Sequence, residues 1–236
     1  MAISFVSAGT EVATTTTTLA LVAPTIVSQD ILFALIVSNN NTAVSAPVNG
    51  GPWNLIADTA NTAAMQTYLA WKQAGIDASG ATFNFTVAGT TLSYGVLVAY
   101  RGARSGGTII GGFSTSANAS ADNVTFATLT PKEVSHIIAF GAYNLSATTA
   151  GAFSGTNPTF TSRVDVETAT GNTASLFVQD GPVLTLAATG SRTLATASTV
   201  DAINHGYLVE LLPQVTESVA SYSSGPKYPS IQRKRS

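Results

Sequence analysis

A short segment around residue 165 carries the residues best suited to catalysis. Arg163, Asp165 and Glu167 alternate with other residues, so in a strand they share one face. Paired carboxylates can perform acid–base catalysis or bind Ca²⁺. The same pattern is typical of a solvated strand face with an ion pair, and we favour that interpretation.

The two histidines of the chain, His136 and His205, could ligate a metal ion. Each is expected to begin a strand, at an equivalent place in a repeated pattern, and neither has a carboxylate cluster near it in sequence. We therefore predict that each is a structural or surface histidine and that there is no metal site.

Catalytic motifs are missing from the sequence. It has no G-x-S-x-G, P-loop or H-E-x-x-H motif, and in Gly151–Gly155 the serine is displaced by one position. It has no cysteine, which excludes disulfides and thiol chemistry. The sequence thus predicts a protein that is not an enzyme and uses no cofactor.

Aromatic side chains could instead bind a sugar by stacking, as in a lectin. Trp53 follows a Gly-Pro turn and is a candidate glycan contact, with core packing as the equal alternative. Trp71 and Tyr68 are expected on opposite faces of one strand, so at most one faces solvent if the other is in the core. We predict that Trp71 is in the core.

The C-terminal segment Ser218–Ser236 differs in charge from the rest of the chain. It carries a net charge of +4, whereas residues 1–217 hold 6 basic and 12 acidic residues, a net charge of −6. Its Ser/Tyr/Pro-rich composition cannot bury a core, so alone it is expected to be disordered. It could bind an acidic partner or nucleic acid, or dock against a neighbouring subunit; a dispensable terminus is the alternative. The candidate partner-binding residues are Tyr222, Lys227, Tyr228, Arg233, Lys234 and Arg235.

Few charges are available to cover the surface. Charged residues make up 9% of the chain, against roughly 25% in a typical soluble domain. Thr, Ser, Asn, Gly and Ala take their place, and such a surface loses water at lower cost when copies pack together. A low-charge extracellular β-domain is the other interpretation.

The hydrophobic pattern predicts strands and very little helix. Residues 82–87 alternate apolar and polar side chains, which is typical of a strand with one core face. Ile31–Val37 and Ile137–Phe140 are continuous apolar runs, as in central strands. No run approaches the roughly 20 residues that cross a bilayer, and the N-terminus has no secretory signal pattern, so no membrane association is expected.

The expected strands occur in two similar cycles, at about residues 25–104 and 130–213. Ile31 aligns with His136 at an offset of 105, and the offset is 107 from Trp71 to Val178 and 111 from Tyr94 to His205. Each cycle provides only four or five strands, and one half cannot cover its own apolar face. We therefore predict one all-β domain over residues 1–217, an antiparallel β-sandwich or jelly roll made of two halves packed face to face. An extended tail follows at 218–236.

Three segments of the first cycle resemble a known family. They are Asp30–Ile36, Pro52–Ile56 and Tyr68–Ala74, and they look like a family of tailed-phage virion proteins with a β-sandwich or jelly-roll module, also found in some bacterial surface proteins. The resemblance extends over about residues 2–213. Pro52 stands where the family usually has glycine before the tryptophan.

The resemblance implies a non-enzymatic structural part of a tailed-phage virion. We expect a capsid decoration protein, present in many copies or as a homo-oligomer, whose tail anchors it to a neighbouring subunit such as the major capsid or a tail protein. Nucleic acid is expected as a partner only through the basic tail. The alternative is a lectin-like receptor-binding module of a tail or fibre that contacts a host-surface glycan.

Overall fold

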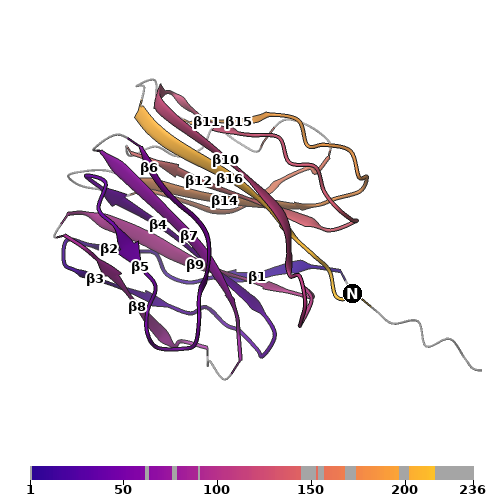
Figure 1. Cartoon of the computed structure of the whole chain (residues 1–236), viewed down its shortest axis with the longest axis horizontal. Helices are drawn as coiled ribbons and strands as arrows, with labels where there is room; N and C mark the ends of the chain where they lie inside the picture. Colours follow the sequence, from indigo (N-terminus) through magenta and orange to yellow (C-terminus); the bar gives the residue numbers. More distant parts are fainter. Residues whose placement is uncertain are drawn as a thin grey trace, which may run out of the picture.

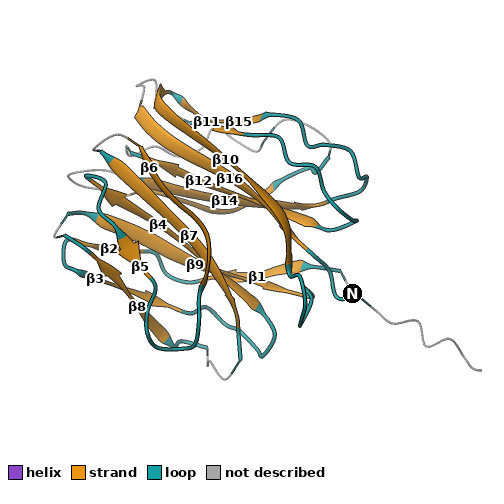
Figure 2. Ribbon diagram, in the orientation of Figure 1, coloured by secondary structure: helices purple, strands orange, loops and turns teal. Residues whose placement is uncertain are grey.

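The structure, a computed structural model, is built from β-strands. It describes residues 2–61, 64–75, 79–89, 91–144, 153, 157–167, 174–196 and 202–215. In these residues it has sixteen strands and no helix (Figure 2), so none that could span a membrane. The prediction of an all-β fold with very little helix is confirmed.

The first large sheet is formed by the N-terminal half of the chain. Its long central strands pair along their whole length, and the apolar run at Ile31–Val37 is buried on both faces, as predicted. The strand order is β1 (Ser4–Ala8), β9 (Ser93–Arg101), β4 (Ile31–Asn39), β7 (Met65–Gln73) and β6 (Asn54–Asn61), with β2 (Val12–Thr14) also paired to β9.

The second large sheet repeats this order with the strands of the C-terminal half. Its order is β10 (Ile110–Ala121), β16 (Ala202–Leu211), β12 (His136–Tyr143), β14 (Ser175–Pro182) and β13 (Thr161–Glu167). Strands that occupy the same place therefore appear in the same sequence along each half. β1 and β2, which precede residue 25, and β10, which lies between residues 104 and 130, belong to these sheets as well, so the sheets extend beyond the predicted cycles.

The pairing registers of the two sheets can be laid on one another. Ile31 pairs with Tyr100 and His136 pairs with Leu211, so β16 follows β9 at the predicted offset of 111 (211 − 100). Ile31 also pairs with Gln73 and His136 with Pro182, so β14 follows β7 at an offset of 109 (182 − 73) instead of the predicted 107. A shift by two positions keeps each side chain on the same face of its strand.

The two large sheets pack face to face and enclose the central core (Figure 1), as predicted for the two halves. Phe33 of β4 and Phe140 of β12 meet in this core with ring centroids 5.2 Å apart. We call the plane between these sheets the seam. Across it the strands meet in reverse order: β1 lies against β13, β9 against β14, β4 against β12, β7 against β16 and β6 against β10.

A small sheet covers the outer face of each large sheet, so the molecule has four layers (Figure 1). The first cap is β3 (Thr18–Val22), β8 (Thr82–Val87) and β5 (Val44–Ser45); the second is β11 (Asn123–Phe126) and β15 (Arg192–Ala195). Each cap encloses a core of its own. The expectation that one half cannot cover its own apolar face holds for the inner face of each large sheet, which the other half covers. The outer face is covered by a cap, which in the first half includes the amphipathic strands of residues 18–22 and 82–87.

One glycine in each large sheet lets its cap lie close. A Cβ on Gly95 of β9 would come within 2.9 Å of Leu19 in the first cap. A Cβ on Gly206 of β16 would collide with the backbone oxygen of Thr125 in the second cap. The two glycines are separated by the same offset as their strands, so each half solves the same packing constraint in the same place.

Candidate functional site

The acidic face predicted on β13 is present, but Arg163 does not belong to it. Asp165 and Glu167 are exposed on this edge strand. A β-bulge between Ser162 and Val164 interrupts the alternation, and the Arg163 guanidinium lies 5.0 Å from the ring of Phe5 across the seam. The expectation of one face shared by all three residues is therefore wrong for Arg163, while the solvated carboxylates agree with the favoured interpretation.

Arg163 instead holds a buried carboxylate at the seam. Its Nε lies 3.0 Å from both oxygens of Asp180, a residue of β14 that is 1% exposed. His136 lies 3.6 Å from the same carboxylate, and its ring is 6.0 Å from Tyr100 of the first half. Burial first, and the Asp180 charge second, raise the pKa of Tyr100 well above its usual value, so its hydroxyl stays protonated. This cluster joins the two halves.

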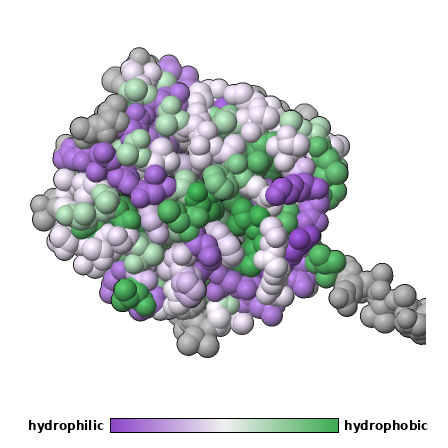
Figure 3. Space-filling view, in the orientation of Figure 1, coloured by the Kyte–Doolittle hydropathy of each residue, from purple (hydrophilic) through white to green (hydrophobic). Residues whose placement is uncertain are grey.

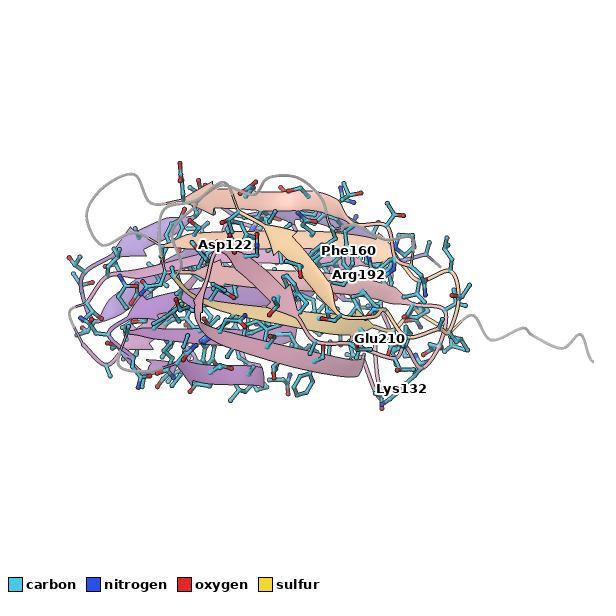
Figure 4. The ribbon with its side chains drawn as sticks, turned by 90° about the horizontal axis from the view of Figure 1, so that it is seen from above. Asp122, Lys132, Phe160, Arg192 and Glu210 are labelled. Atoms are coloured by element: carbon cyan, nitrogen blue, oxygen red, sulfur yellow. The ribbon has the colours of Figure 1, made fainter. Side chains whose placement is uncertain are left out.

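A second buried carboxylate, Glu210 of β16, fastens a loop onto the sheet. Its Oε1 accepts hydrogen bonds from the backbone N–H groups of Lys132 (2.8 Å) and Glu133 (3.4 Å) and from the hydroxyl of Ser135 (2.9 Å). Figure 4 shows Glu210 and Lys132 at the same end of the molecule. Gly111 leaves room for the other carboxylate oxygen, because a Cβ there would collide with it. Sequence analysis missed Glu210, although a lone acid in the apolar run 207–212 is a sign of a buried charge.

The histidines lie at opposite ends of the second sheet. His136 is the first residue of β12, whereas His205 is inside β16 and pairs with Ala142 near the far end of β12. The expected equivalence is wrong, because in register His136 takes the place of Ile31 and His205 that of Tyr94. In the part of the chain that the structure describes, no group of three or more His, Asp or Glu could hold a metal ion.

His205 is a buried, neutral side chain. Its Nδ1 lies 2.8 Å from the Thr67 hydroxyl of β7, so the pair bridges the seam. Burial lowers the pKa of His205 to about 4, because a charged imidazole would lose its water there.

Trp53 packs mainly into the first cap. Its ring centroid lies 5.4 Å from that of Phe83 and 5.2 Å from that of Phe85, and the residue is only partly exposed. The ammonium group of buried Lys72 lies 4.9 Å from the Phe83 ring centroid and donates a hydrogen bond to the carbonyl of Gly50. These contacts favour the core interpretation of Trp53 over the glycan contact.

A cavity of about 580 Å³ opens beside Trp71 instead. Trp71 is partly buried against the central core, and Tyr68 is in the core of the first cap, so the prediction of opposite faces is confirmed. The amide side chains of Asn54 and Gln73 also line this cavity. An aromatic ring with flanking amides could hold a small neutral ligand such as a sugar.

Part of the candidate set lies outside the described residues. This applies to the serine of Gly151–Gly155 and to the tail candidates Tyr222, Lys227, Tyr228, Arg233, Lys234 and Arg235. Among the residues that are described, the buried charges bind partly exposed arginines or backbone groups and so join strands and loops.

Comparison with known proteins gave no relative: no family model matches the sequence, and neither a curated protein nor a solved structure matches it.

Proposed function

We propose that this protein is a non-enzymatic structural subunit of a tailed-phage virion, a capsid decoration protein whose C-terminal tail anchors it to a neighbouring subunit. The proposal starts from the resemblance of residues 30–74 to such virion proteins and from the opposite charges of body and tail.

The inward placement of charge is the observation that carries the proposal. Charges are scarce in this chain, yet five charged side chains are buried among the residues that the structure describes: Asp30, Lys72, Asp180, Arg192 and Glu210. On the face shown in Figure 3, strongly hydrophilic residues are scattered among pale and apolar ones. Such a surface can pack against other subunits without a large cost for removing water from charges.

The tail supplies the specific attachment in this proposal. The tail carries four cations, whereas the body has a net charge of −6. A neighbouring subunit with an acidic body would therefore attract the tail electrostatically. Tyr222 and Tyr228, each near a proline, would then dock in an extended conformation.

Deleting Ser218–Ser236 tests the proposal. We expect a truncated protein with unchanged circular dichroism and thermal midpoint that is missing from particles assembled with the other structural proteins of its virion. A matched full-length variant with glutamine at 227, 233, 234 and 235 separates charge attraction from docking of the tyrosines. Normal incorporation of the truncated protein contradicts the anchoring role.

The cavity beside Trp71 favours a second candidate, a receptor-binding module that contacts a host-surface glycan. The test is a glycan array with the wild type, with Asn54→Ala plus Gln73→Ala, and with Trp53→Ala. Binding that the first variant loses and the second retains supports glycan recognition in the cavity. No binding by the wild type removes this candidate.

A further inference from the structure

The second large sheet ends in an unusual edge strand. β10 is the terminal strand of its sheet, twelve residues long, and its sequence IGGFSTSANASA holds no charged residue and no proline. An edge strand presents unpaired N–H and C=O groups that can pair with another strand. Natural proteins usually protect such edges with short strands, charges, prolines or bulges.

The other edge strands of the described sheets are short or charged. At the opposite edge of the same sheet, β13 exposes Arg163, Asp165 and Glu167 and carries a bulge. In the first large sheet β6 exposes Asp58 and is also bulged. The remaining edge strands, β1, β2, β3, β5, β11 and β15, have five residues or fewer. Among the edge strands that the structure describes, β10 alone is both long and uncharged.

The middle of β10 is regular and firmly held. Its register with β16 shifts only near its ends, so residues 112–118 pair without interruption. The Ser114 hydroxyl donates to the carbonyl of Ala127 at 2.7 Å, and Asn118 donates to Thr125 at 2.7 Å and to Asn204 at 2.8 Å. These bonds fix one face of the strand, so little conformational freedom remains to be lost when its edge is paired.

The opposite face of β10 turns towards the rim of the seam, where β6 lies, yet it is exposed and partly apolar. Phe113, Thr115 and Ala117 point to this face, and Phe113 is 49% exposed. A strand added along the edge would cover part of this aromatic side chain. Burial of apolar area would then add to the new backbone hydrogen bonds.

We propose that β10 pairs antiparallel with β10 of a second copy of this chain, which joins the second large sheets of two subunits into one continuous sheet. Antiparallel self-pairing places the same strand on both sides of a twofold axis, the commonest symmetry of homo-oligomers. A second copy fits better than an acidic or basic peptide, because an uncharged strand offers no charge for such a peptide to match. In self-pairing it also brings no like charges together.

This inference deepens the proposed role as a multi-copy subunit by naming the partner of one edge. It is tested on the purified protein, whereas the tail anchor is tested in particles, so the two can fail separately. Light scattering and sedimentation velocity should give the wild type a mass of twice 24.1 kDa. Thr115→Lys plus Ala117→Lys places lysines opposite lysines across the axis, and we expect at least tenfold weaker dimerisation.

The matched control is Thr82→Lys plus Asn84→Lys. It adds the same charges at the same spacing on the exposed face of β8, the central strand of the first cap, and should remain a dimer. A wild type that is monomeric at every concentration overturns the proposal, as does a β10 lysine variant that dimerises like the control. A dimer lost on deletion of Ser218–Ser236 but kept by the lysine variant assigns the contact to the tail and also overturns it.

Cysteine scanning can locate the twofold axis of the dimer along β10. The chain has no cysteine of its own, so any disulfide must come from the introduced residue. Single cysteines at positions 113 to 117 should form an intersubunit disulfide most rapidly at one residue, since only a residue near the axis faces its own copy. Slow crosslinking along the whole strand, equal to that of a Thr82→Cys control, contradicts strand pairing.

Discussion

The two halves of the molecule share one strand order but bury their charges in different ways. In the first half Asp30 accepts one backbone N–H, that of Val27, and is held mainly by Arg101, whose side chain is 45% exposed at the rim of the sheet. In the second half Asp180 is paired at the seam, and Glu210 lies against backbone N–H groups. The difference teaches that strand order and apolar cores define the fold, while electrostatic contacts can differ between halves.

Removing the Glu210 carboxylate should cause the largest loss of stability among the substitutions proposed here. Glu210→Ala leaves the Lys132 N–H and the Ser135 hydroxyl without their acceptor and opens a cavity, so the free energy of unfolding should fall by about 3–4 kcal/mol. Urea denaturation measures this loss. The comparison in the first half, Asp30→Ala, should cost less, because only the Val27 N–H loses its acceptor while Arg101 can turn into solvent. Equal losses would show that the two halves do not differ in this way.

Neutralising Asp180 should have the next largest effect. In Asp180→Asn the buried partner of Arg163 loses its charge, while the guanidinium can still reach water, so we expect a loss of about 2–3 kcal/mol. Chemical denaturation of Asp165→Asn provides the control, since the same substitution on the exposed β13 edge should stay within about 0.5 kcal/mol of wild type. Similar losses in the free energy of unfolding for both variants would show that the seam cluster does not help to hold the two halves together.

Acid should weaken the seam through His205. Its folded pKa of about 4 lies below the unfolded value of 6.5, so the unfolded chain binds the proton first and stability is lost as pH falls from 6.5 towards 4. Between about pH 7.5 and pH 5.5 this group should account for about 1 kcal/mol. Denaturation of wild type and His205→Gln at both pH values isolates this contribution, because the carboxylates are common to both. An identical pH dependence would mean that His205 does not titrate in this range.

The strands were predictable because their signals are local. The apolar run at Ile31–Val37 and the alternation in residues 82–87 depend only on which faces are buried. Gly95 and Gly206 share the offset that aligns Tyr94 with His205, but only the structure shows that they lie under the caps.

The layers and the buried charges were not predictable, because they depend on distant partners. Alternation in residues 82–87 shows that one face is buried, but not whether a cap or the seam buries it. A bulge moves Arg163 out of the expected face, and no spacing rule reports that Asp180 lies beside it. Glu210 is held by a loop some 75 residues earlier in the chain, which the sequence pattern does not show.

The close approach of each cap at Gly95 and Gly206 has an evolutionary consequence. At Gly206 a Cβ would collide with the backbone of Thr125, so a substitution requires the cap strand to move, whereas at Gly95 it would meet the end of the Leu19 side chain, which has to shift. The charged residues of the two halves have no such tie to one another and are free to diverge. Packing of the caps therefore restricts substitution at the same place in both halves, more strictly at Gly206 than at Gly95.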